Sequence, residues 1–567
     1  MKEVKTAIYP FPWSVTDPEQ RVDLNGNRRD HVVEFFGTPV ILAPMGTQLY
    51  LTSKSIPLPK LGPSLINNRG QLFEVPHGFL AKTSLPLVEL TLREQSHSSR
   101  LSFVLRGAIV APEKSEREKI ESRQISDGVL LHRLIMSWID IINNILGIFS
   151  HAQSNGGHPS RTWTDIAALL LKQKEQSEPR MALIAWIAMR MAREVSDICM
   201  RPRRILICTR QAQRMDRIQE VDGTCLRWLA RQPGLTIPQK AGAKQELLAI
   251  VRKETHDTLE NRILKDFLKR CKHVALEYLG DQMKFHQSKR YKTVQGFKAL
   301  CGRMLSNSPI SNVQSIRRIV KPNYVLQCGQ RYRKIWDLYQ RLLHQDQELD
   351  EAWTWQSRLW TDISRLLAAV ALTSNYEESE LKIYPFTNSE AKFRTEQLCG
   401  TWLIPDSMAG PCFFEYGGKT FVIELIDSYN AAEHELCQHL GRLGGHLYAL
   451  ITDTDSRKQL LIVFWAIHGA GSNAMPDLKK IAVSASNSLF FNYENLKQLY
   501  AVVPQIAGCV LVSTLSDITK PQTSMPEKQP AKVQVIQLPS RPEQWHDALN
   551  YIQIFLVEAL DLIKGGA

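Results

Sequence analysis

The chain has 567 residues, of which 44% are hydrophobic and 22% charged, so it is not a wholly disordered protein and holds enough apolar material for several cores. At roughly 100 to 200 residues per domain, this length predicts three or four domains. The 70 Lys and Arg residues outnumber the 57 Asp and Glu residues, which gives a formal net charge of +13. The longest uninterrupted apolar run, 460–467, is far shorter than the roughly 20 residues of a spanning helix, so we expect no membrane insertion.

The N-terminal residues and the cysteines argue against three further classes of protein. Two lysines near the N-terminus are not followed by an apolar segment, which argues against a signal peptide and predicts a cytoplasmic protein. The 10 cysteines form no CxxC pair, so neither a zinc ribbon nor a disulfide framework is expected.

Short apolar runs separated by Pro, Gly and Asn predict a β-rich N-terminal domain. Apolar periodicity then predicts helices, at 127–151, 163–174, 181–199, 243–280, 332–343 and 353–372. Beyond residue 382, strand-like runs alternate with a helix-compatible stretch at 431–443, which is typical of an α/β domain. Residues 519–532 are rich in Pro and Lys and predict a flexible linker, followed by an amphipathic helix at 542–563.

We therefore predict a multidomain α+β protein. Its parts are a β-rich N-terminal domain (1–115), a helical basic domain (116–350), an α/β domain (351–518), and a linker with a C-terminal helix (519–567).

The surplus of positive charge lies in the middle of the chain. Residues 201–340 hold 29 Lys and Arg against 11 Asp and Glu, a local net charge of +18. Within this region, residues 282–334 contain no acid at all and five interleaved aromatics, Phe285, Tyr291, Phe297, Tyr324 and Tyr332. The basic residues of this acid-free segment are Lys284, Lys289, Arg290, Lys292, Lys298, Arg303, Arg317, Arg318, Lys321, Arg331, Arg333 and Lys334.

Two interpretations of this segment remain open. Cations without acidic neighbours attract a polyanion, and aromatics between them can stack on exposed bases, which predicts nucleic-acid binding, with DNA the natural candidate. Alternatively, the segment is a solvated basic face that packs against acidic parts of the same chain or of a partner, with the aromatics in the core.

Candidate chemistry lies in the α/β region. Pro405-Asp406 precedes a strand that contains Glu424, and nucleases of the PD-(D/E)XK type use two such carboxylates to bind Mg²⁺, with a lysine two residues after the second acid. That lysine position is occupied by Ile426 here, although a β-hairpin could bring Lys419 to the neighbouring strand. We therefore take Asp406, Glu424 and Lys419 as candidate catalytic residues, with Asp406 and Glu424 as candidate Mg²⁺ ligands.

Two other motifs give no evidence of a functional site. Gly417-Gly418-Lys419-Thr420 is not a phosphate-binding loop, because the motif's first glycine would fall at Phe413 and a strand follows. The spacing of His434, Cys437, His439 and His446 fits no standard zinc pattern, so we expect these side chains to be packed or exposed on one helix.

The stretch Thr258-Leu259-Glu260-Asn261-Arg262 opens a helix for which we expect an ordinary amphipathic pattern and a surface ion pair. Together with residues 322–327 and 331–336, it resembles a bacterial family of uncharacterised domains. In that family a β-rich part and a helical middle with an "ENR…FL" helix precede a PD-(D/E)XK nuclease-like domain, often in restriction and other phage-defence loci. The resemblance implies that the helix at 353–372 opens the nuclease-like domain, with Asp406 and Glu424 at its metal positions.

The chain also departs from this family. A glutamate usual before a Leu-Trp pair on the opening helix is Arg358 here, and the catalytic lysine is Ile426. We therefore predict a DNA-binding component of a multi-protein anti-phage defence system with a degenerate nuclease-like domain. An active Mg²⁺-dependent DNA endonuclease and a scaffold that docks an acidic partner protein are the alternatives.

Overall fold

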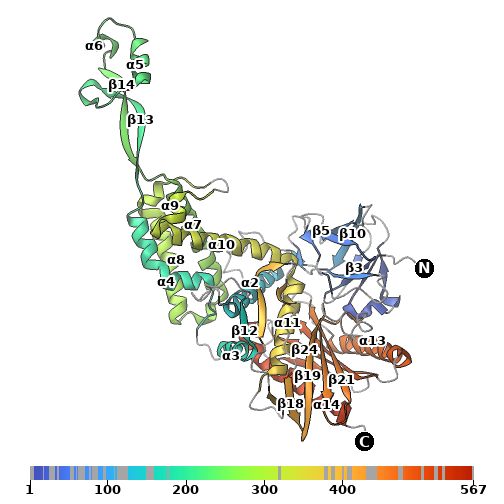
Figure 1. Cartoon of the computed structure of the whole chain (residues 1–567). Coiled ribbons are helices and arrows are strands. Elements are labelled where there is room, and N and C mark those ends of the chain that lie inside the picture. Colours follow the sequence, from blue (N-terminus) through green and yellow to red (C-terminus); the bar gives the residue numbers. More distant parts are fainter. Residues whose placement is uncertain are drawn as a thin grey trace. The chain divides into compact units, whose positions relative to one another are not determined.

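The computed structural model divides into two compact units, and each is described by itself below (Figure 1). Unit 1 comprises residues 1–182 and 346–567, and unit 2 comprises residues 183–345. The structure describes residues 6–16, 18–24, 32–34, 38–51, 56–58, 60–61, 70–75, 78–79, 87–93, 98–106, 109–110, 126–147, 159–174, 178–316, 321–375, 381–384, 390–398, 401–404, 412–428, 443–469, 477–499, 503–515, 521–525, 530–539 and 541–564.

The N-terminal part of unit 1 is built from β-strands, as its short apolar runs predict. One sheet has the order β2-β1-β4-β7 and another the order β3-β10-β9-β5-β6. Side chains of both sheets, including Ile8, Ile41, Phe73, Leu90 and Phe103, share one buried cluster. The strands are β1 (Ala7–Tyr9), β2 (Val22–Asp23), β3 (Val32–Glu34), β4 (Val40–Ala43), β5 (Gln48–Leu51), β6 (Ile56–Pro57), β7 (Gln71–Glu74), β9 (Leu87–Arg93) and β10 (Ser98–Arg106).

The C-terminal part of unit 1 contains an eight-stranded mixed sheet of order β15-β18-β19-β20-β21-β22-β24-β23. Neighbours from β15 to β21 pair antiparallel, whereas β21, β22 and β24 run parallel and β23 closes the edge antiparallel. The strands are β15 (Lys382–Tyr384), β18 (Cys412–Tyr416), β19 (Lys419–Asp427), β20 (Leu447–Asp453), β21 (Gln459–His468), β22 (Gln505–Ser513), β23 (Gln522–Ser524) and β24 (Lys532–Leu538).

Helices cover both faces of this sheet. The helices α11 (Gln356–Thr373) and α14 (Trp545–Lys564) share a buried cluster with Phe421, Ile423 and Leu425 of β19. The helix α13 (Leu478–Leu499) packs on the other face, in a separate cluster that includes Ile426. All residues of α11 are buried, so this helix is a central element of unit 1.

The first two long helices also belong to unit 1, so the division differs from a helical domain spanning 116–350. These helices are α2 (Asp127–Ile145) and α3 (Trp163–Lys174). Both contribute to the cluster of α11, where the rings of Trp138 and Trp360 lie 5.4 Å apart. The physical reason is that α2 is apolar around most of its circumference, which suits a helix packed between other elements.

Unit 2 consists of helices and a long β-hairpin. Its helices are α4 (Leu183–Met200), α7 (Leu259–Asp281), α8 (Lys289–Asn307), α9 (Tyr324–Cys328) and the start of α10 (Gln330–Thr354). The hairpin strands β13 (Ile205–Arg214) and β14 (Glu246–Thr255) extend away from these helices and carry the short helices α5 (Gly223–Ala230) and α6 (Ile237–Lys240) at their far end (Figure 1).

Three sequence-based assignments of secondary structure require correction or lie outside the described residues. The helix predicted at 243–280 is instead the strand β14 followed by α7, because the side chain of Thr258 caps a helix that begins at Leu259. The linker predicted at 519–532 contains the edge strand β23, and the missed strand β24 begins at Lys532. The helix predicted at 431–443 falls almost entirely on residues that the structure does not describe.

In the described part of the chain, no helix combines the length and the apolar character that crossing a membrane requires.

Candidate functional site

The structure does not bring the candidate lysine to the candidate acid of β19. Lys419 and Glu424 are an odd number of residues apart on one strand, so their side chains point to opposite faces of the sheet. The Lys419 Nζ lies 3.3 Å from Asp453 Oδ2, and Glu424 is exposed on the face away from the α11 cluster. Asp406 lies outside the described residues, so the Mg²⁺ pair of Asp406 and Glu424 stays a prediction.

Lys419 has a partner that explains its position. Burial raises the pKa of Asp453, but hydrogen bonds from Ser456, the Asp455 backbone and Lys419 outweigh it and lower the pKa to about 2. The carboxylate is therefore ionised at neutral pH and holds the lysine at the turn between β20 and β21. Lys419 thus forms an ion pair between the start of β19 and the end of β20. In this position it cannot activate a water molecule at Glu424.

A different set of charged residues is buried near the carboxyl end of β19. Arg365 of α11 forms ion pairs with Asp362, at 2.7 Å, and with Asp427. Asp362 Oδ2 also accepts the backbone N–H groups of Trp402 and Leu403, at 2.5 and 3.1 Å. None of the three charged side chains is more than 2% exposed, so a guanidinium neutralises two carboxylates inside the protein.

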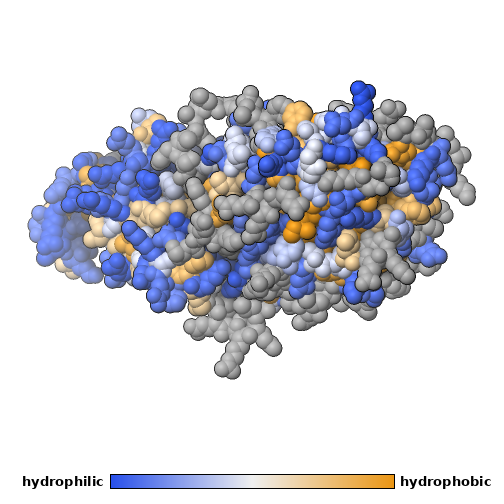
Figure 2. Space-filling view, turned by 90° about the horizontal axis from the view of Figure 1, so that it is seen from below, coloured by the Kyte–Doolittle hydropathy of each residue, from blue (hydrophilic) through white to orange (hydrophobic). Residues whose placement is uncertain are grey.

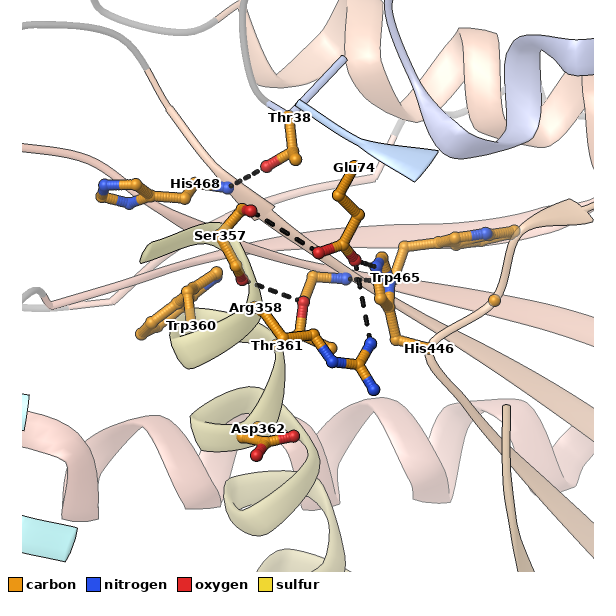
Figure 3. Close-up of polar contacts among 12 residues, drawn as sticks. Thr38, Glu74, Ser357, Arg358, Trp360, Thr361, Asp362, His446, Trp465 and His468 are labelled. Carbon is orange, nitrogen blue, oxygen red and sulfur yellow. Dashed lines mark hydrogen bonds and ion pairs between the residues drawn. The ribbon is translucent and has the colours of Figure 1, made fainter. Parts of the chain in front are cut away.

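A second buried cluster lies one to two turns earlier on α11 (Figure 3). Glu74, the last residue of β7, accepts hydrogen bonds from Ser357 at 3.5 Å and His446 at 3.2 Å, and lies 3.9 Å from Arg358 Nη1. Arg358 Nε donates to Thr401 Oγ1 at 3.1 Å. This cluster connects the N-terminal sheet, α11 and the segment before β20.

His446 is neutral in this cluster. Its Nδ1 accepts the backbone N–H of Ala466 at 3.0 Å, so the ring proton is on Nε2 and is donated to Glu74. Burial lowers the pKa of His446, whereas Glu74 acts to raise it and Arg358 and Arg365 act to lower it. His446 therefore lies in the buried segment before β20, whereas His434, Cys437 and His439 lie outside the described residues.

These clusters stabilise the fold and do not resemble an open metal site. Hydrated Mg²⁺ keeps several water ligands, which requires carboxylates that reach solvent, whereas Glu74, Asp362 and Asp427 are shielded and bonded to protein cations. Among the residues that the structure describes, no group of three His, Cys, Asp or Glu side chains could hold a metal ion. Sequence reasoning singled out Arg358 but missed Arg365 and its two acids; the available signal was charge within an otherwise apolar helix.

The basic segment 282–334 presents most of its cations at the surface of unit 2. Lys334 is paired with Glu194 at 2.9 Å, Arg290 and Lys298 are half-buried, and Arg317 and Arg318 lie outside the described residues. The face of unit 2 that is turned to the viewer, at the left of Figure 2, is predominantly hydrophilic. The exposed cations of the segment are Lys284, Lys289, Lys292, Arg303, Lys321, Arg331, Arg333 and Lys334.

Three of these cations share one face of α8. Lys289, Lys292 and Arg303 are separated by three and eleven residues, which places them on one side of a 3.6-residue helix, opposite the buried Val294. Gly296 lies between them, and a Cβ at this position would meet nothing within 4 Å. The face is therefore cationic, and the backbone is accessible at its centre.

The aromatics divide between surface and core. Phe297 and Tyr332 are 2% and 8% exposed, and Phe285 and Tyr291 are half-buried, whereas Tyr324 is 77% exposed. Of the five aromatics, only Tyr324 therefore presents most of its ring to a stacking partner.

The Glu260-Asn261-Arg262 motif is not the surface feature that we expected. Glu260 and Asn261 are 1% and 0% exposed. Asn261 Nδ2 donates to the carbonyl oxygens of Arg203 and His256, both at 2.7 Å, and its Oδ1 accepts from Tyr332 at 2.7 Å. Because Arg203 precedes β13 and His256 follows β14, Asn261 fixes both strands of the hairpin to α7.

Glu260 and Arg262, on either side of Asn261, also bind residues near the hairpin. Glu260 Oε1 accepts from Arg203 at 2.5 Å and from Asn323 at 2.9 Å. Burial acts to raise the pKa of Glu260, but hydrogen bonds from its own backbone, Thr258 and Asn323, together with the charge of Arg203, outweigh it and lower the pKa. Arg262 forms two bonds with Asp257, at 2.8 and 2.6 Å. The motif thus has a structural role, which is to anchor the hairpin.

Residues 166–339 match the family model of a domain of unknown function, DUF2357. The match starts within α3, runs into α10 and includes the hairpin, its anchor and the cationic face of α8. None of the curated proteins matches the chain.

Proposed function

We propose that the protein is a DNA-binding component of a multi-protein anti-phage system, with a nuclease-like domain that does not cleave DNA. The single observation that carries DNA binding is the cationic face of α8 within the acid-free segment 282–334. The place in a defence system rests on the sequence resemblance of the "ENR…FL" helix and the residues after it.

The first turn of α8 supports an anionic ligand. Ser288 caps the helix by accepting from the Tyr291 N–H at 3.2 Å, and the first turn contains Lys289, Arg290 and no acid. Cations at a helix N-terminus repel the positive end of the helix dipole, whereas a phosphate there would be attracted by both. Helices usually have acidic residues in the first turn, whereas α8 has two cations there, as expected of a surface that binds phosphate.

The absence of cleavage is supported by the environment of α11. A nuclease of the resembled type needs carboxylates that exchange ligands with water and Mg²⁺. Lys419 instead pairs with Asp453 and lies on the face of β19 opposite Glu424, and the buried acids Asp362 and Asp427 near the carboxyl end of β19 are held by Arg365. In this proposal the domain provides a folded support, and the DNA contacts come from unit 2.

The test of DNA binding compares two triple variants of the full chain. The first variant removes the three cations of the α8 face through the changes Lys289→Gln, Lys292→Gln and Arg303→Gln. The control variant removes three exposed cations of α13, with the same change in net charge, through the changes Lys479→Gln, Lys480→Gln and Lys497→Gln. Fluorescence anisotropy with a 30-base-pair duplex should show an affinity at least about tenfold lower for the α8 variant and an unchanged affinity for the control. An equal loss in both variants would mean that only total charge matters and would contradict the proposed face.

The active-nuclease alternative is tested separately. Pure protein is incubated with supercoiled plasmid and Mg²⁺ or Mn²⁺, next to the Glu424→Ala variant. The proposal predicts no cleavage by either protein. Cleavage that Glu424→Ala abolishes would establish the enzyme and overturn the degenerate-domain interpretation.

A further inference from the structure

Among the residues that the structure describes, no strand pairs with the outer side of β13, so the hairpin of unit 2 has an open edge there. Its strands pair over ten residue pairs, from Ile205 opposite Thr255 to Arg214 opposite Glu246. The sheet has only these two strands among the described residues. The outer side of β14 is partly covered, because the Ile250 N–H donates to the Glu220 carbonyl at 2.9 Å.

The same hydrogen bond identifies which backbone groups of β13 point outwards. Ile250 uses its N–H away from β13, so it and its partner Arg210 form a non-hydrogen-bonded pair of the antiparallel ladder. The N–H and C=O groups of Arg210 therefore face the open edge, and with a period of two so do those of Leu206, Cys208 and Ala212. This edge is a regular row of donors and acceptors ready for another strand.

The side chains beside this edge are unusually apolar for an exposed ribbon. Ile205, Leu206 and Ile207 are 38%, 62% and 42% exposed. Two-stranded hairpins are marginally stable on their own, and long exposed apolar edges are normally blocked by charge, proline or covering elements. Here β13 contains no proline and no acid, and its apolar residues Ile205–Ile207 are exposed beside the open edge.

The charge along the edge favours an acidic occupant. Residues 201–215 contain five arginines and no acid. Arg204, Arg210 and Arg252 have acidic partners in Glu254, Asp222 and Glu220, so the ribbon already binds carboxylates along its length. The outer half of β13 is thus suited to acidic side chains, and the inner half, at 205–207, to apolar ones.

The ribbon is also held firmly at its base. Asn261 binds a carbonyl oxygen at the foot of each strand, and Glu260 binds the side chain of Arg203. A strand that is ordered before binding loses less conformational entropy when a peptide adds to it. The buried anchor therefore prepares the open edge for binding.

We propose that β13 accepts an extended segment of a partner protein as a third strand, and that this segment places acidic residues beside Arg214 and apolar residues beside Ile205–Ile207. The backbone edge gives affinity through strand addition, and the two kinds of side chain set the direction of the added strand. This inference is independent of the DNA contacts proposed for α8.

The experiment uses the full chain and a fluorescent ten-residue peptide. Its first half alternates glutamate with threonine and its second half alternates valine with threonine, which matches an antiparallel strand on β13. Ala212→Pro removes an N–H that faces the open edge and leaves the ladder to β14 intact, whereas Ala212→Thr keeps that N–H and is the matched control. Leu206→Asp is a second variant that keeps the backbone and reverses the character of the apolar end.

We expect the peptide to bind the unmodified chain and Ala212→Thr equally, and to bind Ala212→Pro and Leu206→Asp at least tenfold more weakly. A peptide with lysine in place of glutamate should also bind at least tenfold more weakly. Equal binding to Ala212→Pro and Leu206→Asp, displacement of the peptide by duplex DNA, or no binding to the unmodified chain at about 1 mM peptide would each overturn the proposal. Circular dichroism of each variant shows whether the fold is retained, and Leu206→Asp decides the outcome if Ala212→Pro does not fold.

Discussion

Arg365 should be one of the most important side chains for the stability of unit 1. The change Arg365→Met retains a long apolar side chain but removes the only charge that the structure places between Asp362 and Asp427 among the described residues. Two carboxylates that are at most 2% exposed would then be left without their cation. Removing one partner of a buried ion pair typically costs about 3–5 kcal/mol, and here two acids depend on the same guanidinium.

The loss is measured by thermal and urea unfolding, followed by tryptophan fluorescence. For a unit as large as unit 1, with an unfolding entropy of about 0.85 kcal/mol/K, we expect Tm to fall by roughly 5 °C. Lys497→Met, which removes an exposed partner of Glu494, is the control and should not change Tm measurably. The triple change Arg365→Met, Asp362→Asn and Asp427→Asn removes both orphaned charges and should recover part of the loss. Unchanged stability of Arg365→Met, or no recovery in the triple variant, would refute the view that these charges compensate each other inside the fold.

Two further predictions concern the buried hydrogen bonds. Asn261→Ala should destabilise unit 2 by about 3 kcal/mol in urea titrations, because two carbonyl oxygens and the Tyr332 hydroxyl lose their hydrogen-bond partner. Arg262→Ala removes the half-exposed ion pair with Asp257 and should cost clearly less. Equal losses in the two variants would contradict the role of Asn261 as the anchor of the hairpin. Burial lowers the pKa of His446 in the folded state. As pH falls below about 6.5, the unfolded chain therefore takes up a proton on His446 before the folded chain does. The free energy of unfolding should then decrease by about 1–2 kcal/mol between pH 7 and pH 5. His446→Gln should remove this part of the pH dependence in urea titrations at the two pH values, and an unchanged dependence would assign it to other groups.

Local patterns in the sequence were sufficient for many elements. Apolar periodicity placed α3 and α4 to within two residues, and the strand-like runs beyond residue 382 indicated the strands β18 to β21. The strand β14 was missed because 246–255 continues the apolar spacing of the following helix, and only pairing with β13 makes it a strand. Strand pairing is a non-local interaction, and local propensity does not reveal it.

The buried charges show a similar limit. Periodicity indicates that α11 is buried, but partners of Arg358 and Arg365 come from β7, β17 (Thr401–Leu403) and β19, which are distant in sequence. The motif Glu260-Asn261-Arg262 likewise reads as a surface pair until the backbone of 203 and 256 is placed beside it. In contrast, the exposed cations of 282–334 could be predicted, because an acid-free segment has few internal partners for its charges.

Unit 2 is proposed to bind DNA through phosphate contacts, and the dependence of DNA affinity on salt concentration measures the number of these contacts. With about six phosphate contacts, the logarithm of the association constant should fall against the logarithm of salt concentration with a slope near −5. In the Lys289→Gln, Lys292→Gln and Arg303→Gln variant, three contacts are removed, so the slope should become shallower by about 2.7. A slope that is the same in the variant and the unmodified chain, or no binding to DNA at physiological salt, would contradict the account.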